Sequence, residues 1–269
     1  MKVALLQTTV YDDKDKNLSE ASSLLKKATD EGAEVAILPE MFNCPYETEK
    51  FPIYAEERGD KSYAALSKMA KENGVLLIGG SIPEKDGERL YNTSFVFAPD
   101  GSEIAFHRKA HMFDINIEGK QSFKESDSFT PGDKSTVFEY KGHIFGLAIC
   151  FDIRFPELFR NMALDGAEAI FVPAAFNMTT GPMHWELAFR SRSVDNQVFT
   201  IGCAPARSRN GKYVPFAHSI VCNPWGRVIC DAGENACVAI AEIDLEEVKS
   251  VRAQLPILSA RKPEIYKLK

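Results

Sequence analysis

The stretch Gly146-Leu147-Ala148-Ile149-Cys150-Phe151-Asp152 places a cysteine at the end of an apolar, strand-like run. A helical pattern follows over residues 156–165, and a second apolar run covers residues 168–173. Buried strands that alternate with helices are typical of α/β folds, which present reactive groups from strand ends on a rigid scaffold. Cys150 therefore occupies a position at which such a fold can present a nucleophile.

The same mixture of strand-like and helix-like patterns continues along the chain. Strands are expected over residues 3–7, 35–38, 75–79, 90–97, 103–107, 136–140, 143–150, 168–173, 197–203, 219–222, 227–231 and 237–243, and helices over 18–28, 63–72, 156–165, 184–195 and 245–254. Hairpin turns at Pro99-Asp100-Gly101 and Lys141-Gly142 interrupt any regular βα repeat, which argues against a TIM barrel. The pattern favours a layered α/β sandwich with helices outside and sheets inside. No linker divides residues 1–269, so a single domain is expected.

Composition and charge exclude several classes of partner. The formal net charge is −6, and the one dense basic stretch, His107-Arg108-Lys109, is too short to neutralise a nucleic-acid backbone. No apolar run approaches the roughly 20 residues that span a bilayer. The apolar run within residues 1–7 is also too short for a signal peptide. We therefore expect a cytoplasmic protein with no nucleic-acid partner and no membrane association.

The cysteines and histidines show no metal-binding spacing. None of the six cysteines forms a C-x-x-C pair, and none of the five histidines forms an H-x-H or H-E-x-x-H pair. A cytosolic protein of this size is not expected to carry a disulfide framework, so most cysteines are expected to be small buried side chains. The chain also lacks the G-x-S-x-G and G-x-G-x-x-G motifs of serine hydrolases and dinucleotide-binding enzymes. Neither a metal nor a cofactor is expected.

Glu40 and Lys109 also follow strand-like runs, and together with Cys150 they form a chemically complete set. Each residue taken singly has an ordinary structural explanation. A thiol attacks an amide only as the thiolate, and its ordinary pKa is about 8.5. Glu40 could take the thiol proton and later protonate the leaving nitrogen, while Lys109 and the backbone N–H of Phe151 could stabilise the oxyanion. The set predicts hydrolysis of the C–N bond of a small amide.

Three separated motifs resemble those of the nitrilase superfamily of carbon–nitrogen hydrolases. They are Leu38-Pro39-Glu40, Arg108-Lys109-Ala110-His111-Met112-Phe113 and the run from Cys150 to Leu158, in the family's order. The resemblance spans nearly the whole chain and implies a four-layer αββα sandwich that forms a homodimer. It also implies that Cys150 is the nucleophile, Glu40 the general base and acid, and Lys109 the oxyanion cation. A second family glutamate matches Glu125, which would orient Lys109 and help to position the amide.

Other stretches are similar to the ω-amidase branch of this superfamily. They include Phe42-Asn43-Cys44-Pro45-Tyr46 and the run 179–187. This likeness implies hydrolysis of α-ketoglutaramate and α-ketosuccinamate to the 2-oxo dicarboxylate and ammonia through a thioester. The residues that it implies for binding the substrate carboxylate are Tyr46 and Lys120. Candidates for the pocket wall are Phe42, Phe176, Met178 and Thr179, although aromatic and Met residues are more often part of the core. For Arg154, packing or a role in holding the Cys150 turn is as plausible as substrate contact.

Several alternatives remain open at this level. A deaminated glutathione amidase and an N-carbamoyl amidase would share Glu40, Lys109 and Cys150, so these residues do not discriminate among the small-molecule amides. A true nitrilase would use the same thiol, but the run 179–187 argues against it. A catalytically silent scaffold on the same fold is disfavoured because all three residues are present. The C-terminal stretch 244–269 is expected to pack across a dimer interface.

Overall fold

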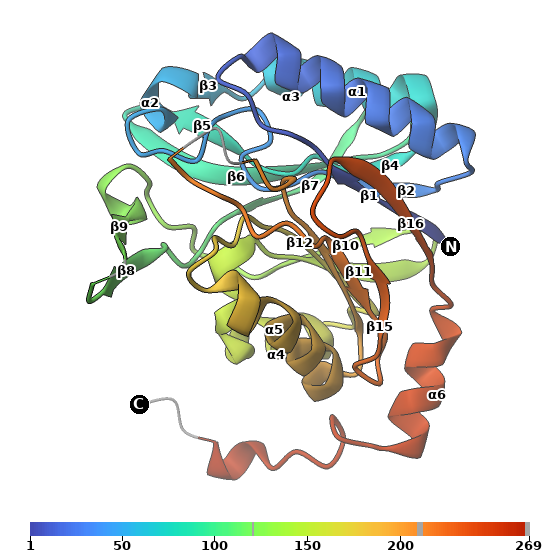
Figure 1. The fold of residues 1–269 in the computed structure, drawn as a ribbon. Helices are drawn as coiled ribbons and strands as arrows, with labels where there is room; N and C mark the ends of the chain where they lie inside the picture. The colour runs from blue at the N-terminus through green and yellow to red at the C-terminus, as the bar shows by residue number, and fades with distance from the viewer. Residues whose placement is uncertain (120, 209–211, 267–269) are drawn as a thin grey trace.

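The computed structural model describes residues 1–119, 121–208 and 212–266 (Figure 1). The helices are α1 (Lys14–Asp30), α2 (Phe51–Tyr54), α3 (Lys61–Asn73), α4 (Pro156–Leu164), α5 (Gly181–Asn196) and α6 (Glu246–Gln254), with short 3-10 helices η1 (Glu125–Asp127), η2 (Cys150–Arg154) and η3 (Pro263–Ile265). The strands are β1 (Lys2–Gln7), β2 (Val35–Ile37), β3 (Glu56–Glu57), β4 (Leu76–Ile78), β5 (Ile82–Asp86), β6 (Arg89–Phe97), β7 (Glu103–Arg108), β8 (Asp114–Ile117), β9 (Gln121–Lys124), β10 (Thr136–Tyr140), β11 (His143–Leu147), β12 (Ala169–Pro173), β13 (Phe199–Cys203), β14 (Ile220–Cys222), β15 (Val228–Asp231) and β16 (Cys237–Glu242).

Within the described ranges, the strands form two large sheets and one small hairpin. The first sheet has the order β16-β1-β2-β4-β6-β5-β3, with β7 also paired to β6, and the second has the order β10-β11-β12-β13-β14-β15. At the centre of the sheets, β1, β2 and β4 are parallel to one another, as are β11, β12 and β13. The β8–β9 hairpin projects to one side (Figure 1). Parallel strands bring their carboxyl ends to one edge, where α/β proteins place ligands.

Alternating side chains on the central strands create four layers. In β1, Val3 and Leu5 face the second sheet, whereas Ala4 and Leu6 pack against α1 and α3. In β12, alternate residues contact the first sheet or the cluster formed with α4 and α5. Successive strand side chains point to opposite faces, so each sheet is buried on both sides. The two sheets therefore share one apolar interior and each carries helices on its outer face (Figure 1).

Local signals explain where the main helices begin and end. The Asp13 side chain accepts a hydrogen bond from the Lys16 backbone N–H and caps α1. Gly74 ends α3 in the left-handed conformation, with a φ of 60°, that glycine adopts at little cost. Proline stands in the first turn of both α4 and α5, where no intrahelical donor is lost.

The architecture agrees with the expected αββα sandwich, and the differences are local. The strand expected over residues 143–150 ends at Leu147, because Cys150 adopts a φ of 46° and begins η2. The helix expected over 184–195 begins three residues earlier, at Gly181. The β8–β9 hairpin, β5 and the short elements α2 and β3 were not expected.

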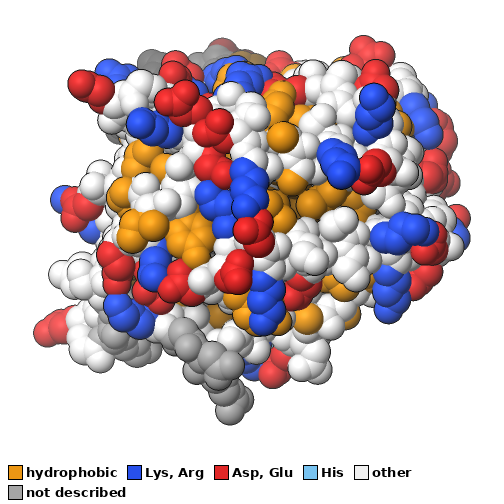
Figure 2. All heavy atoms as spheres, turned by 90° about the horizontal axis from the view of Figure 1, so that it is seen from above, with side chains coloured by type: hydrophobic (Ala, Val, Ile, Leu, Met, Phe, Trp, Pro, Cys, Tyr) orange, Lys and Arg blue, Asp and Glu red, His pale blue; other side chains and the backbone are white. Residues whose placement is uncertain are grey.

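The outer surface agrees with the reading of the composition. On the face seen in Figure 2, which looks down on the α1 and α3 side, basic and acidic side chains are interspersed and not gathered by sign. Among the described residues, no helix is long and apolar enough to cross a membrane.

Candidate active site

Four predicted site residues meet between the two sheets although they come from distant parts of the chain. Glu40 follows β2, Lys109 directly follows β7, Cys150 begins η2 after β11, and Glu125 begins η1 after β9. Glu40, Lys109 and Glu125 are completely buried, and Cys150 is 5% exposed. The ends of the central strands therefore bring these side chains into one enclosed cluster.

Lys109 lies between the two carboxylates. Its Nζ is 2.8 Å from Glu40 Oε1 and lies 2.8 and 3.0 Å from the two carboxylate oxygens of Glu125. Burial by itself lowers the pKa of Lys109, but the charges of Glu125 and Glu40 outweigh burial and raise this pKa above its ordinary value. The ammonium group therefore remains charged, and its position is fixed from both sides.

Tyr46 and Asn92 complete the polar contacts of the two carboxylates. The Asn92 amide donates to Glu40 Oε1 at 2.8 Å and to Glu125 Oε1 at 3.2 Å. The Tyr46 hydroxyl lies 3.4 Å from Glu40 and 3.3 Å from Glu125. Glu125 also accepts a hydrogen bond from the Phe113 backbone N–H at 2.6 Å. Buried charges are stable only when such partners satisfy them, so these contacts hold Glu40 and Glu125 in place.

The second oxygen of Glu40 is left available to the Cys150 thiol. No nitrogen or oxygen donor among the described residues contacts Glu40 Oε2. Burial raises the pKa of Glu40, Lys109 offsets part of this shift, and Glu125 adds to it. Burial also raises the pKa of Cys150 well above its ordinary value, and the Glu40 charge raises it further. The resting thiol is therefore neutral, and the carboxylate beside it is a stronger base than an exposed glutamate.

The Cys150 turn is strained. Cys150 has a φ of 46°, and Met41, directly after Glu40, has a φ of 51°. Side-chain-bearing residues rarely adopt this left-handed region, and such strain concentrates at functional sites. The Cys150 thiol and the residue after Glu40 thus both occupy backbone conformations that their surroundings must enforce.

Asp152 provides much of that enforcement for Cys150, and sequence reasoning assigned it no role. It is fully buried and accepts hydrogen bonds from the backbone N–H groups of Ala110, His111 and Ile149 at 3.0–3.2 Å. The same carboxylate hydrogen-bonds to the rings of His107 at 3.0 Å and His111 at 2.7 Å. It therefore ties the segment after Lys109 to the residue that precedes Cys150.

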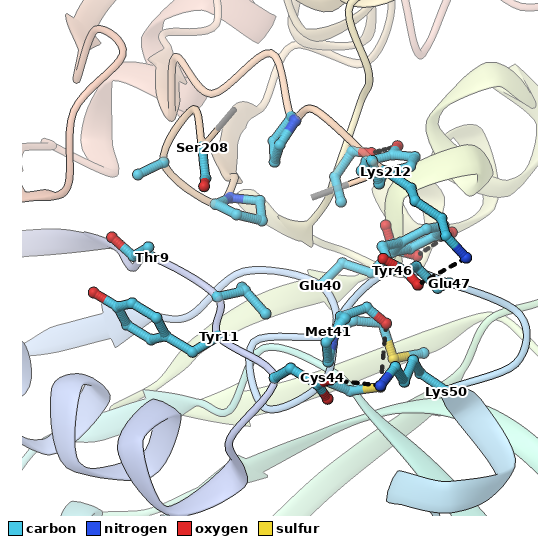
Figure 3. Close-up of a pocket in the computed structure, with 18 of the residues that line it drawn as sticks. Thr9, Tyr11, Glu40, Met41, Cys44, Tyr46, Glu47, Lys50, Ser208 and Lys212 are labelled. Carbon is cyan, nitrogen blue, oxygen red and sulfur yellow. Dashed lines mark hydrogen bonds and ion pairs between the residues drawn. The ribbon is translucent and has the colours of Figure 1, made fainter. Parts of the chain in front are cut away.

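Two cavities adjoin this cluster. The larger measures about 570 Å³ and is lined by Glu40 and Tyr46 on one side and by Thr9 and Tyr11 on the other (Figure 3). The smaller measures about 10 Å³ and is lined by Cys150 and the residues Phe113, Phe151, Arg154, Ala175, Phe176, Thr180 and Tyr213. The reactive groups of the cluster are thus reached from two sides.

The residues predicted to bind substrate occupy different places around these cavities. Tyr46 lines the larger cavity and Phe176 the smaller one. Met178 is 42% exposed, and neither it nor Thr179 lines either cavity. Lys120 lies outside the described residues. Among the described residues, no group of three or more histidine, cysteine, aspartate or glutamate side chains is arranged to hold a metal ion.

Arg154 places a positive charge beside the thiol. Its guanidinium lies over the rings of Phe151 and Phe176, 5.6 and 5.0 Å from their centres, and Nη1 is 3.2 Å from His184 Nδ1. Among the described residues, no carboxylate forms an ion pair with it. Burial lowers the pKa of Arg154, although an arginine remains charged at neutral pH. The smaller cavity therefore combines a thiol, aromatic walls and a cation that pairs with no carboxylate of the described residues.

Comparison with known proteins assigns this arrangement to a family. The family model described as carbon-nitrogen hydrolase matches residues 2–253. The chain belongs to the carbon–nitrogen hydrolase family. Among relatives of this carbon–nitrogen hydrolase, the omega-amidase NIT2 of Bos taurus is 45% identical over 267 residues, covering 99% of this chain and 97% of the bovine protein. The human omega-amidase NIT2 is 43% identical over 265 residues, covering 98% and 96%.

Solved structures support the same family and fold. Nit3 of Saccharomyces cerevisiae, a member of branch 10 of the nitrilase superfamily, is 39% identical and superposes with a TM-score of 0.90, covering 99% of this chain and 97% of Nit3. The C. elegans NitFhit protein is 28% identical, with a TM-score of 0.89, covering 99% of this chain and 66% of NitFhit. The predicted superfamily and αββα fold are confirmed. The chain is an enzyme of the class that hydrolyses carbon–nitrogen bonds.

Replacement of Asp152 by Asn is expected to lower the free energy of unfolding by about 3–5 kcal/mol at pH 7. The amide NH₂ group of Asn would face buried backbone N–H groups, donor against donor, and the negative charge that now accepts their hydrogen bonds would be lost. The hydrogen bonds to Asp152, those from His107 and His111 foremost, outweigh burial and lower its pKa. The stabilisation is therefore complete above the ordinary carboxyl pKa of about 3.9 and is lost as the pH falls toward the lower folded-state pKa. The difference between wild type and variant should narrow below pH about 3.9.

Urea unfolding at pH 7 and at several lower pH values measures this difference. Asp127→Asn is the matched control, because Asp127 is exposed and pairs with Lys124 at the surface. Its effect should stay within about 0.5 kcal/mol. Equal stability of the two variants at pH 7 would contradict the role assigned to Asp152.

Proposed function

We propose that this carbon–nitrogen hydrolase is an ω-amidase, acting on the amide of 2-oxo dicarboxylate monoamides such as α-ketoglutaramate and α-ketosuccinamate. The full-length similarity to proteins named omega-amidase supports this substrate class. The observation that carries the proposal is the guanidinium of Arg154, which lines the same cavity as Cys150 and has no carboxylate partner among the described residues. A substrate that bears a carboxylate a few bonds from its amide would supply an ion-pair partner for Arg154 and a carbonyl carbon for the Cys150 thiol.

The first half-reaction forms a thioester. Glu40 takes the thiol proton as the amide carbonyl approaches, and the Cys150 sulfur bonds to the carbonyl carbon. Lys109 and the backbone N–H of Phe151, in the first turn of η2, stabilise the oxyanion. Glu40 then gives the proton to the leaving nitrogen, the C–N bond breaks and ammonia departs. The raised pKa values of both Glu40 and Cys150 suit this exchange, since the thiolate forms only when the proton has an acceptor.

The second half-reaction regenerates the thiol. Glu40 removes a proton from a water molecule, and the hydroxide oxygen bonds to the thioester carbon. Collapse of the tetrahedral intermediate breaks the C–S bond, releases the dicarboxylate and returns the proton to sulfur. Glu125 contributes by fixing the position of Lys109, whose Nζ lies 2.8 and 3.0 Å from the two Glu125 carboxylate oxygens.

Ammonia release is expected to be fastest with α-ketosuccinamate and α-ketoglutaramate in a panel that also contains succinamate, deaminated glutathione, an N-carbamoyl amino acid and a simple nitrile. Cys150→Ala should reduce turnover by at least about 10³-fold, since the nucleophile is lost. Cys230→Ala, which removes a half-buried thiol outside both cavities, is the control. Preference for another amide would refute the ω-amidase assignment, and a fully active Cys150→Ala variant would refute the mechanism.

Arg154→Gln is expected to raise KM for α-ketoglutaramate at least about tenfold while leaving KM for an uncharged amide of similar length nearly unchanged, because a desolvated charge pair contributes most to carboxylate binding. Steady-state kinetics on both substrates measure the difference. Arg58→Gln, at a surface ion pair with Glu103, is the control. An equal rise in KM for both substrates would show that Arg154 only packs against the turn. Lys120 remains a predicted carboxylate ligand.

We also propose that residues 1–269 form one catalytic domain and that the functional unit is a homodimer built on the α5 face. Helix α5 carries apolar side chains on two sides: Trp185 and Phe189 are buried, whereas Met183 and Leu187 are 73% and 63% exposed. A helix that is apolar on both sides is usually covered on both. A cytoplasmic location remains a prediction.

Leu187→Asp is expected to convert the dimer to a monomer, because a charge would be buried without a partner at the interface. Sedimentation velocity at micromolar concentration measures the change. Ile53→Asp is the matched control, since Ile53 is a similarly exposed apolar residue (74%) on α2, outside the α5 face. A monomeric wild type, or a dimer unaffected by Leu187→Asp, would refute this interface.

A further inference from the structure

Two cavities of very different size lie near the Cys150 thiol. The space at the thiol, about 10 Å³, holds one water molecule at most, whereas the cavity on the Glu40 side measures about 570 Å³. Of the residues that line the small space, Ala175 and Tyr213 also line the large one. Ala175 contributes only a methyl group and its backbone, so the ring of Tyr213 is the bulk between the two spaces.

Tyr213 is held in this position by several contacts. Its hydroxyl donates to the carbonyl oxygen of Ala175, and its ring packs on the ring of Tyr46 with centres 4.7 Å apart and an angle of 34°. Three residues after Tyr213, the Phe216 backbone N–H donates a hydrogen bond to the Phe176 carbonyl oxygen at 2.7 Å, which fixes the position of this segment. The ring is therefore held against the segment that follows β12, whose Ala175 lines both cavities.

The other rings at the thiol, those of Phe113, Phe151 and Phe176, do not line the large cavity. Phe113 packs on Phe151 with ring centres 5.3 Å apart, and Phe176 packs on Trp185 with centres 5.1 Å apart. Because interiors are close-packed, such rings cannot retreat without displacing their neighbours. Tyr213 alone among these aromatic residues has the large cavity on its far side.

We infer that Tyr213 is a specificity-determining residue: its ring closes the thiol off from the large cavity and so limits the length of the acyl chain that Cys150 can accept. The inference deepens the proposed ω-amidase function and rests on it for the substrate class. A four- or five-carbon monoamide, once it has displaced the side chains that close the small space, would keep its carboxylate on the Arg154 side of the ring. A chain of six or seven carbons needs the volume that the ring now separates from the thiol.

The large cavity, of about 570 Å³, has room for the chains that Tyr213 excludes. Its rim carries Lys50 and Lys212, and its far end presents the hydroxyl groups of Thr9 and Tyr11 (Figure 3). Both lysines pair with carboxylates at the surface, Lys50 with Asp12 at 2.5 Å. The carboxylates of Asp12, Glu40, Glu47 and Glu49 line the same cavity, so it offers a longer acyl chain volume and not a net positive charge.

The test compares kcat/KM across the monoamides of four-, five-, six- and seven-carbon dicarboxylic acids and their 2-oxo forms. Tyr213→Ala is expected to raise the ratio of the six- and seven-carbon values to the four-carbon value at least about tenfold. Tyr213→Phe keeps the ring and should change the ratio less than about threefold. Tyr11→Ala removes a ring from the far end of the same cavity and should leave the ratio unaltered. If Tyr213→Ala does not fold, Tyr213→Leu replaces it.

Alkylation of Cys150 provides a readout that does not need turnover. The rate constants for iodoacetamide and N-benzyl iodoacetamide are measured by mass spectrometry on the peptide that contains Cys150. Tyr213→Ala should raise the benzyl-to-unsubstituted ratio at least about tenfold, and Tyr213→Phe and Tyr11→Ala should not.

The two readouts separate failure of the inference from failure of the proposed function. If the alkylation ratio rises in Tyr213→Ala but wild type hydrolyses no ω-amide, the ω-amidase assignment is overturned and the partition stands. If wild type hydrolyses ω-amides and a folded Tyr213→Ala or Tyr213→Leu variant changes neither ratio, the role of Tyr213 is overturned.

Discussion

The buried ion cluster of Lys109, Glu40 and Glu125 is the constraint on which the rest of the site depends. Moving a charge out of water costs several kcal/mol, and this cost is offset only by opposite charges and hydrogen bonds at short range. Here one ammonium group serves two carboxylates at 2.8–3.0 Å. Asn92 supports both carboxylates, and the Phe113 backbone supports Glu125. The arrangement leaves one oxygen of Glu40 uncommitted, and that oxygen is the one available to the thiol.

The strained turn at Cys150 depends on a second buried charge. Asp152 binds backbone donors on both the β7 end and the β11 end, so it couples the position of Lys109 to that of the thiol. The left-handed backbone conformation of Cys150 raises the free energy of the folded state by itself. The surrounding hydrogen bonds must therefore stabilise this conformation relative to other conformations of the turn. Cys150, Lys109 and Glu40 are thus held by hydrogen bonds between segments more than 40 residues apart in sequence.

The chemistry of the site is poised for a substrate that completes it. The amide of such a substrate gives the Cys150 thiol a carbonyl carbon to attack and gives the Glu40 carboxylate a nitrogen to protonate. The substrate's carboxylate gives the Arg154 guanidinium the ion-pair partner that it lacks among the described residues. Related amidases would share Glu40, Lys109 and Cys150. The proposed substrate class therefore follows from the neighbouring Arg154 more than from these three residues. The ring of Tyr213 adds a steric condition to these electrostatic ones, because shape and charge together define which amide reaches the sulfur.

The sequence by itself determined the layered α/β architecture, since the apolar runs and helical periodicities of the main elements persist in β1, α1, β12 and α5. It also identified Glu40, Lys109, Glu125 and Cys150 as candidates, because strand ends and family motifs are local patterns. Tertiary structure decided what local patterns do not encode. The β8–β9 hairpin is short and polar, so its sequence resembles a loop. The roles of three residues depend on their neighbours in the folded chain. Asp152 has hydrogen-bond partners on both sheets, Arg154 has no carboxylate partner among the described residues, and Tyr213 lines both cavities. Burial and contacts between distant residues set these properties, and no local pattern records them.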